Sequence, residues 1–195
     1  MDKIRLGKTN MMVTRVGFGG IPIQRLTENE AIAVVKSCLE LGINFLDTAN
    51  GYTTSEERIG KAIKGYREKI ILATKSRSCD PEELSQHLTL SLKRLGVDYI
   101  DLYQFHGIND FASLDKNLEP GGAEAVVMKA QERGIVRHGT YPADRSMSLK
   151  KSYVPAFSRL SPPEASDELI PLCRKLDVGF ICIKPLESGK CSKSK

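Results

Sequence analysis

The sequence lacks paired cysteines and long apolar runs. Its five cysteines are irregularly spaced and form no Cys-x-x-Cys pair: Cys38, Cys79, Cys173, Cys182 and Cys191. This pattern argues against a disulfide framework or a zinc site and favours a reducing compartment. No apolar stretch approaches the ~18 residues of a membrane span, and the first residues carry no apolar signal-peptide segment. We therefore expect a cytoplasmic protein with no membrane contact and no bound metal.

The sequence also lacks a concentrated basic region. The net charge is +5, but the lysines and arginines are scattered, and only the final segment GKCSKSK is a run of positive charge. There is no basic helix and no platform of aromatic and basic residues, so we expect no nucleic-acid binding. We interpret the basic tail, 187–195, as a frayed terminus. The length of 195 residues suits a single domain, 1–195.

Six short apolar runs rich in β-branched residues predict strands. They start near residues 13, 43, 69, 99, 135 and 178, and the first intervals are close to one strand–helix unit each. Apolar strands that alternate with helices are typical of a parallel sheet covered by helices. The regular interval favours a (β/α) barrel over an open doubly wound sheet, although spacing alone is compatible with both. The early segment 3–13 could form a hairpin across the bottom of the barrel.

Helix signals lie between these strands. A capping box starts at Thr27, and Asp80 precedes a proline that suits the first helical position. Ser55 can cap a further helix whose first turn carries two glutamates. Two more helices are expected over about 122–133 and 168–176, the second only if its proline lies in the first turn.

Polar residues follow three consecutive predicted strands. Asp47 and Tyr52 come after the second strand, Lys75 after the third and His106 after the fourth. Taken singly, each has a structural interpretation: a turn cap, a packed ring, a solvated strand end and a loop histidine. Active sites of such barrels lie at the C-terminal ends of the strands. Together the four therefore form a candidate catalytic group.

The four side chains suit proton transfer to a carbonyl oxygen. A phenol with a pKa near 10 is a poor acid–base group at neutral pH. We expect Lys75 to lower the pKa of Tyr52, Asp47 to hold Lys75 charged, and His106 to orient the substrate oxygen. General acid catalysis of this kind contributes on the order of 10²–10⁴-fold. Because no side chain can deliver hydride, a nicotinamide cofactor is implied.

These motifs resemble those of the aldo-keto reductase superfamily, in particular its microbial subgroup. The matching segments, in order, are GFGGIPI, FLDTANGY, SEERIG, ATKS, SLKRLGVDYIDLYQFH and GIVRHGT. The resemblance covers 1–140, where it is good from about Lys3, and 166–186. It implies an α/β fold of the (β/α)8 TIM-barrel type and NAD(P)H-dependent reduction of an aldehyde or ketone, a small-molecule carbonyl substrate.

The resemblance also implies the site residues. The catalytic tetrad would be Asp47, Tyr52, Lys75 and His106. The cofactor-binding positions would be Gly19, Gly20, Asp47, Thr140, Lys184, Pro185 and Leu186. The family favours NADP(H), with NAD(H) also possible. Members of this subgroup often carry an iron–sulfur segment, but no cysteine cluster for it exists here, so we do not expect that cofactor.

Two parts of the chain depart from the family pattern. Residues 141–165 replace the turn that would hold the nicotinamide amide, together with the helix and strand that follow it. The chain then ends before an eighth strand and its phosphate-binding loop. We therefore expect an incomplete barrel, with the sixth unit compressed and the eighth strand absent, that binds NADP(H) poorly.

Two other functions are compatible with the sequence. Lys75 and Lys184 stand at strand ends, where Schiff-base aldolases of the same fold keep their lysine, and borohydride trapping would distinguish that activity. The chain could also be a catalytically impaired remnant that binds a cofactor or a partner weakly, for instance through an open sheet edge. Cofactor titration would distinguish the remnant from the reductase. The sequence specifies neither the carbonyl substrate nor the oligomeric state.

Overall fold

Five of the predicted apolar runs contribute strands to one parallel sheet. The computed structural model describes residues 1–108, 111–139 and 170–181. Each strand of this five-stranded sheet pairs in parallel with the next one along the chain. In order, the strands are β3 (Phe18–Gly19), β4 (Phe45–Asp47), β5 (Ile71–Ser76), β6 (Ile100–Phe105) and β7 (Val136–Gly139).

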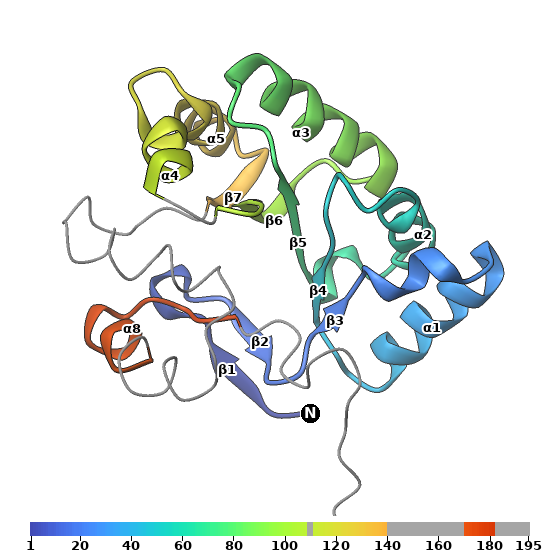
Figure 1. Ribbon diagram of the computed structural model, residues 1–195. Coiled ribbons are helices and arrows are strands. Elements are labelled where there is room, and N and C mark those ends of the chain that lie inside the picture. The colour runs from blue at the N-terminus through green and yellow to red at the C-terminus, as the bar shows by residue number, and fades with distance from the viewer. Residues whose placement is uncertain (109–110, 140–169, 182–195) are drawn as a thin grey trace, which may run out of the picture.

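Helices connect these strands and cover one face of the sheet. Figure 1 shows the sheet as an arc, with the connecting helices along its outer side. Right-handed crossovers between strands paired in chain order place all the helices on the same face. This arrangement is an arc of a barrel and not a doubly wound sheet, which has helices on both faces. The connecting helices are α1 (Glu28–Glu40), α2 (Ser55–Ala62), α3 (Pro81–Leu95), α4 (Phe111–Leu118) and α5 (Ala123–Glu132).

Several predicted helix ends are confirmed. The hydroxyl of Thr27 accepts a hydrogen bond from the Glu30 N–H, and the Glu30 carboxylate accepts one from the Thr27 N–H, which forms the predicted capping box. α3 starts after Asp80, whose carboxylate accepts a hydrogen bond from the main chain of its first turn. The last described helix, α8 (Ile170–Leu176), holds Pro171 in its first turn, as required.

The predicted N-terminal hairpin is also present. β1 (Lys3–Arg5) and β2 (Met12–Thr14) pair antiparallel around a short 3-10 turn, η1 (Gly7–Thr9). The hairpin side chains join strand side chains in an apolar cluster inside the arc: Leu6, Val13, Phe45, Ala73 and Leu102. The hairpin therefore closes the end of the arc opposite the strand exits. Two other 3-10 turns are η2 (Pro22–Arg25) and η3 (Arg67–Lys69).

The predicted strand from residue 178 is not formed in the described residues Val178–Ile181. The chain before it is held by the hairpin instead, because the Lys8 N–H donates to the Asp177 carbonyl oxygen at 2.9 Å. Arg5 also pairs with the Asp177 carboxylate at 2.6 and 2.8 Å. The rest of that predicted strand, the segment 141–165 and the tail 187–195 lie outside the described residues.

Two helix predictions need correction. Ser55 is the first residue of α2 and not its cap, because its hydroxyl is hydrogen-bonded to Gly20 and Thr48. α4 is an additional helix that the sequence analysis does not predict. None of the helices in the described ranges combines the length and apolar character that crossing a bilayer requires.

Candidate active site

The pleat of the strands brings three predicted residues to one side. Asp47 lies two positions beyond Phe45, and Lys75 lies two positions beyond Ala73; both apolar residues belong to the cluster inside the arc. Side chains two residues apart in a strand point to the same face. His106 follows β6 directly, and its main-chain N–H donates to the Ser76 carbonyl oxygen at 2.7 Å. Neighbouring strand exits are therefore held together.

A buried ion pair forms the centre of the site. The Lys75 Nζ lies 2.5 Å from the Asp47 Oδ2 and 2.7 Å from the carbonyl oxygen of Thr48. The side chains of Lys75 and Asp47 are 8% and 14% exposed. Burial raises the pKa of Asp47, and the charge of Lys75 opposes this shift. The structure thus contains the contact through which Asp47 was expected to hold Lys75.

Tyr52 reaches this pair from the loop between β4 and α2. Its ring centroid lies 5.2 Å from the Lys75 Nζ, with the ammonium over the ring. The ring of His106 meets it edge to face, with centroids 5.5 Å apart and an interplanar angle of 86°. The four side chains predicted from the strand exits therefore gather at one place, at the C-terminal ends of the strands.

The net pKa shift of the phenol is opposite to the expected one. The pKa of Tyr52 is raised above its ordinary value, chiefly by burial and then by the charge of Asp47, whereas Arg77 lowers it. The ammonium of Lys75 is paired with Asp47 and lies over the ring of Tyr52. Tyr52 therefore holds its proton at neutral pH and is suited to act as a proton donor.

The loop that carries Tyr52 is fixed by both flanking elements. The Asn50 N–H donates to the Lys75 carbonyl oxygen at 2.9 Å, which extends the strand pairing past the end of β4. The Asn50 side-chain amide donates to α3, at the His87 carbonyl oxygen and the Ser91 hydroxyl. The position of the phenol is consequently tied to β5 and to α3.

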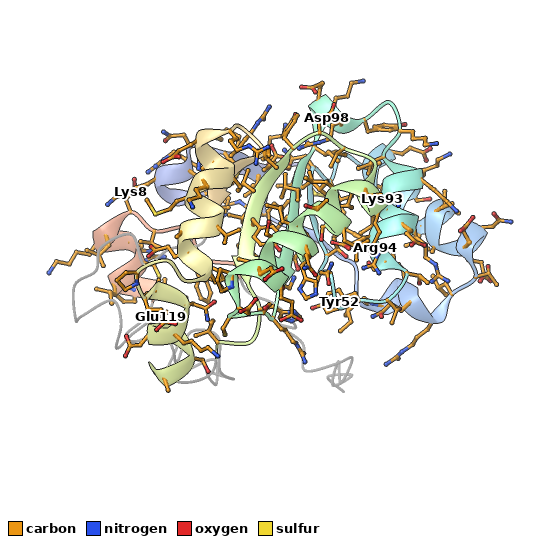
Figure 2. All side chains as sticks on the ribbon, turned by 90° about the horizontal axis from the view of Figure 1, so that it is seen from above. Lys8, Tyr52, Lys93, Arg94, Asp98 and Glu119 are labelled. Carbon is orange, nitrogen blue, oxygen red and sulfur yellow. The ribbon has the colours of Figure 1, made fainter. Side chains whose placement is uncertain are left out.

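A second buried charge supports the same loop. Glu56 is 1% exposed and accepts a hydrogen bond from the Thr74 hydroxyl at 2.7 Å. Arg94 on α3 lies 3.5 Å from the Glu56 carboxylate and donates to the Asn50 carbonyl oxygen at 3.1 Å. Figure 2 labels Arg94 and Tyr52. The sequence interpretation missed these contacts, because it assigned the glutamate only to the first turn of a helix.

A cavity of about 270 Å³ opens beside His106, at the exits of β5 and β6. Its lining residues are Arg77, Cys79, His106, Gly107, Ile108 and Ser113. Of these, the sequence analysis had singled out only His106 for the site. The period of two that links Ala73 and Lys75 continues to Arg77, and this signal could have identified the arginine.

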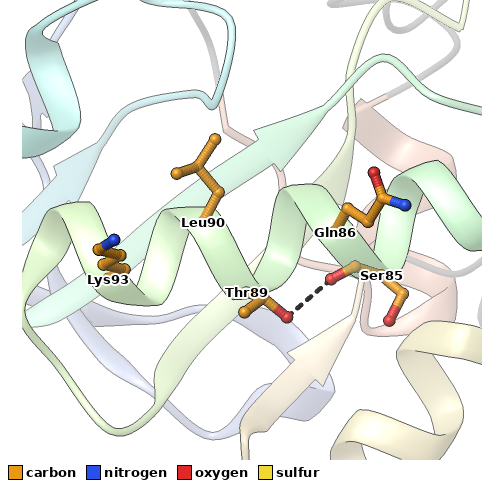
Figure 3. Close-up of a pocket in the computed structure, with 5 residues that line it drawn as sticks. All are labelled: Ser85, Gln86, Thr89, Leu90 and Lys93. Carbon is orange, nitrogen blue, oxygen red and sulfur yellow. Dashed lines mark hydrogen bonds between the residues drawn. The ribbon is translucent and has the colours of Figure 1, made fainter.

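Another hollow, of about 320 Å³, lies on the outer surface of α3 (Figure 3) and is lined by Ser85, Gln86, Thr89, Leu90 and Lys93. These residues are exposed, and they lie on one helix, away from its buried positions. The hydroxyl of Thr89 donates within the helix, to the Ser85 carbonyl oxygen at 2.9 Å. This hollow is therefore separate from the four gathered side chains.

The predicted cofactor positions differ in the free space around them and in their hydrogen bonds. Gly19 lies opposite Asp47 in the sheet, and a Cβ at Gly19 would meet no atom within 4 Å. A Cβ at Gly20 would lie 2.5 Å from the Ser55 hydroxyl, so Gly20 is needed for packing, and its N–H is bonded to the Asp47 carbonyl oxygen. The predicted positions that lie outside the described residues are Thr140, Lys184, Pro185 and Leu186.

One buried polar atom is suited to a cofactor hydroxyl. The Asp47 Oδ1 is buried and has no hydrogen-bond partner in the described part of the chain. A carboxylate oxygen in this state can accept a hydrogen bond from a sugar hydroxyl. Across residues 1–108, 111–139 and 170–181, no group of three or more His, Cys, Asp or Glu side chains could hold a metal ion.

The curved parallel sheet is part of a (β/α)8 barrel. A buried lysine–aspartate pair, a phenol and an imidazole lie together at its strand ends, and this combination defines a class of such barrels. The chain belongs to the Aldo/keto reductase family, which residues 15–195 match. The family resemblance and the barrel fold class predicted from the sequence are thus both confirmed.

Individual relatives agree with this assignment. The chain is 28% identical to an uncharacterized oxidoreductase of Bacillus subtilis (strain 168) and 30% identical to a probable aldo-keto reductase of Glycine max. Each comparison covers 97% of this chain, but only 66% and 60% of the two relatives, so the chain spans less than two thirds of their length. The structure is similar to the holo form of an aldo-keto reductase from Bacillus halodurans, with a TM-score of 0.75 and 29% identity over 100% of this chain and 70% of that one.

Proposed function

We propose that the chain catalyses NAD(P)H-dependent reduction of an aldehyde or ketone, with Tyr52 as the proton donor. The observation that carries this proposal is the gathering of Tyr52 and His106 around the buried Lys75–Asp47 pair. Membership of the Aldo/keto reductase family supports the same reaction class. The substrate is a small carbonyl compound, and the pattern of cysteines supports a reducing, cytoplasmic setting.

Each side chain has a distinct part in the proposed reaction. The chemistry that a bound nicotinamide cofactor supplies is hydride transfer to the carbonyl carbon. The carbonyl oxygen gains negative charge and takes the proton of the Tyr52 hydroxyl. The ammonium of Lys75, held by Asp47, stabilises the phenolate that remains. His106 orients the carbonyl oxygen beside the phenol.

Gly19 and Asp47 are the described residues best placed to hold the nicotinamide end of the cofactor. Gly19 leaves open space, and the Asp47 Oδ1 can accept a hydrogen bond from a ribose hydroxyl. We infer NADP(H) as the preferred cofactor from the family resemblance, with Thr140 and 184–186 as further contacts.

The ion pair also bears on the aldolase alternative. A Schiff-base lysine needs a neutral amine to attack the carbonyl carbon. Lys75 instead donates hydrogen bonds to a carboxylate and to a carbonyl oxygen, which occupy its amine. The proposed reductase therefore predicts no covalent adduct at Lys75 after borohydride treatment with a carbonyl compound.

The test is stoichiometric turnover by the purified chain. NADPH or NADH is first titrated by fluorescence, and a panel of aldehydes and ketones is then assayed at the cofactor concentration that the titration sets. We expect one alcohol formed for each NAD(P)H consumed. Cofactor binding without alcohol formation would refute the proposed activity, and absence of cofactor binding would favour the impaired remnant.

A further inference from the structure

The cavity at the exits of β5 and β6 adjoins the proposed proton-transfer group. His106 belongs to both, since it contacts the Tyr52 ring and lines the cavity. At about 270 Å³, the cavity is slightly below the range of roughly 300–1,000 Å³ that is usual for small-molecule sites. A carbonyl compound whose reacting group lies at Tyr52 and His106 would therefore extend its remaining atoms into this cavity.

Arg77 brings a full positive charge to the cavity. It is exposed and forms no ion pair with any residue of the described ranges. The other basic side chains of the site differ from it, because Lys75 is paired with Asp47 and Arg94 lies against Glu56. The charge of Arg77 also extends to the phenol, where it lowers the pKa of Tyr52 against the effect of burial.

The acidic side chains that follow Arg77 in sequence are engaged elsewhere. The Asp80 carboxylate accepts a hydrogen bond from the Glu83 N–H at 2.8 Å, at the start of α3. The Glu83 carboxylate accepts one from the Ser78 hydroxyl and lies 3.8 Å from the ring of His87. Neither carboxylate therefore pairs with Arg77, which lines the cavity.

We propose that Arg77 is a specificity-determining residue that binds a carboxylate on the carbonyl substrate, so that the preferred substrates are oxo acids. This proposal rests on the proposed reductase function. A guanidinium presents paired N–H donors that match the two oxygens of a carboxylate. The reacting carbonyl would lie at Tyr52, and the carboxylate would lie across the cavity at Arg77.

The test compares two aldehydes of similar shape and different charge, 4-carboxybenzaldehyde and 4-methylbenzaldehyde. In the unaltered chain, we expect a higher kcat/KM for the carboxylate compound. Arg77→Gln should lower kcat/KM for that compound by on the order of tenfold to a hundredfold, mainly through KM. The value for the methyl compound should fall less than the value for the carboxylate compound, so the ratio of the two kcat/KM values is the readout. Arg77→Lys should restore part of the preference. Arg133→Gln, at an exposed arginine that ends α5, is the matched control for net charge.

A second measurement does not depend on turnover. Binding of 4-carboxybenzaldehyde to the chain and to Arg77→Gln is followed by ligand-observed NMR, with 4-methylbenzaldehyde as the neutral reference. Selective loss of carboxylate binding in Arg77→Gln supports the anion site even if neither aldehyde is reduced. The absence of reduction would refute only the proposed function. Equal effects of the substitution on both aldehydes would overturn the role of Arg77. A loss of NADPH affinity in place of carboxylate affinity would also overturn it, because the arginine would then bind the cofactor's phosphates.

Discussion

Tyr52 donates the proton in the proposed reaction, and this function can be removed by deleting one oxygen atom. Replacing it with phenylalanine keeps the ring that packs against Lys75 and His106 and deletes the hydroxyl. We expect Tyr52→Phe to reduce carbonyl turnover by on the order of 10²-fold or more, with cofactor affinity nearly unchanged. Steady-state kinetics and fluorescence titration measure the two effects. A phenylalanine variant that keeps most of its turnover would refute the assigned role.

The ionisation of Tyr52 gives a second prediction at this scale. Because its pKa in the folded chain is raised above the ordinary value near 10, the phenol should stay protonated beyond that pH. The unfolded chain ionises first, so the stability that this group contributes is present below pH ~10 and is lost as the pH rises through the folded-state pKa.

Ultraviolet difference titration of the unaltered chain against Tyr52→Phe isolates this group from the other tyrosines. Arg77→Gln should move the Tyr52 transition to still higher pH, because a charge that favours the phenolate is removed. Ionisation of Tyr52 below the ordinary phenol range would contradict the prediction and would agree with the lowered pKa first expected from the sequence.

The elements α2 and α3 meet at Arg94, which links the Tyr52 loop to a buried carboxylate. Arg94→Met would leave Glu56 without its cation and the Asn50 carbonyl oxygen without a donor. We expect a loss of about 1–3 kcal/mol in the free energy of unfolding. Turnover should fall as well, since the loop that positions Tyr52 loses one of its supports.

Lys93 is the matched control on the same helix; it is exposed and lies next to Arg94 (Figure 2). Lys93→Met should change stability by no more than about 0.5 kcal/mol, which is usual for surface positions. Urea unfolding of both variants measures the difference. Equal stabilities for the two would show that the Arg94 contacts contribute nothing.

On the scale of the whole molecule, the hairpin and the segment after α8 meet at Gly7. A Cβ at Gly7 would lie 2.2 Å from the Gly179 nitrogen, and Gly7 has a φ of +52°. Gly65 also has a positive φ, +81°, but its Cβ would meet nothing within 4 Å. Gly65→Ala therefore tests the backbone strain alone, at about 1–2 kcal/mol.

Gly7→Ala should add a packing conflict to that strain. We expect it to lose at least about 1 kcal/mol more than Gly65→Ala in the free energy of unfolding, because the segment 177–179 must move away from the hairpin. Denaturant unfolding of the two variants gives the comparison. Equal losses would mean that the hairpin and this segment do not pack closely in solution.

Much of this protein follows from local sequence signals. The capping box at Thr27 and the proline start after Asp80 act within a few residues, so the sequence alone locates those helices. The period of two along a strand also acts locally, and it places Asp47 and Lys75 on the inner face of their strands. The candidate catalytic group itself was predicted from polar residues at consecutive strand ends, which are also local features of the sequence.

The tertiary structure decided what depends on distant neighbours. Ser55 packs against Gly20 instead of capping its helix, and the pKa of Tyr52 is raised chiefly by burial. Arg77 is a candidate for substrate binding only because β5 and β6 bring it and His106 to the same cavity. Hydrogen bonds, burial and charge pairing between residues far apart in the chain leave no local pattern, so these features could be learned only from the folded arrangement.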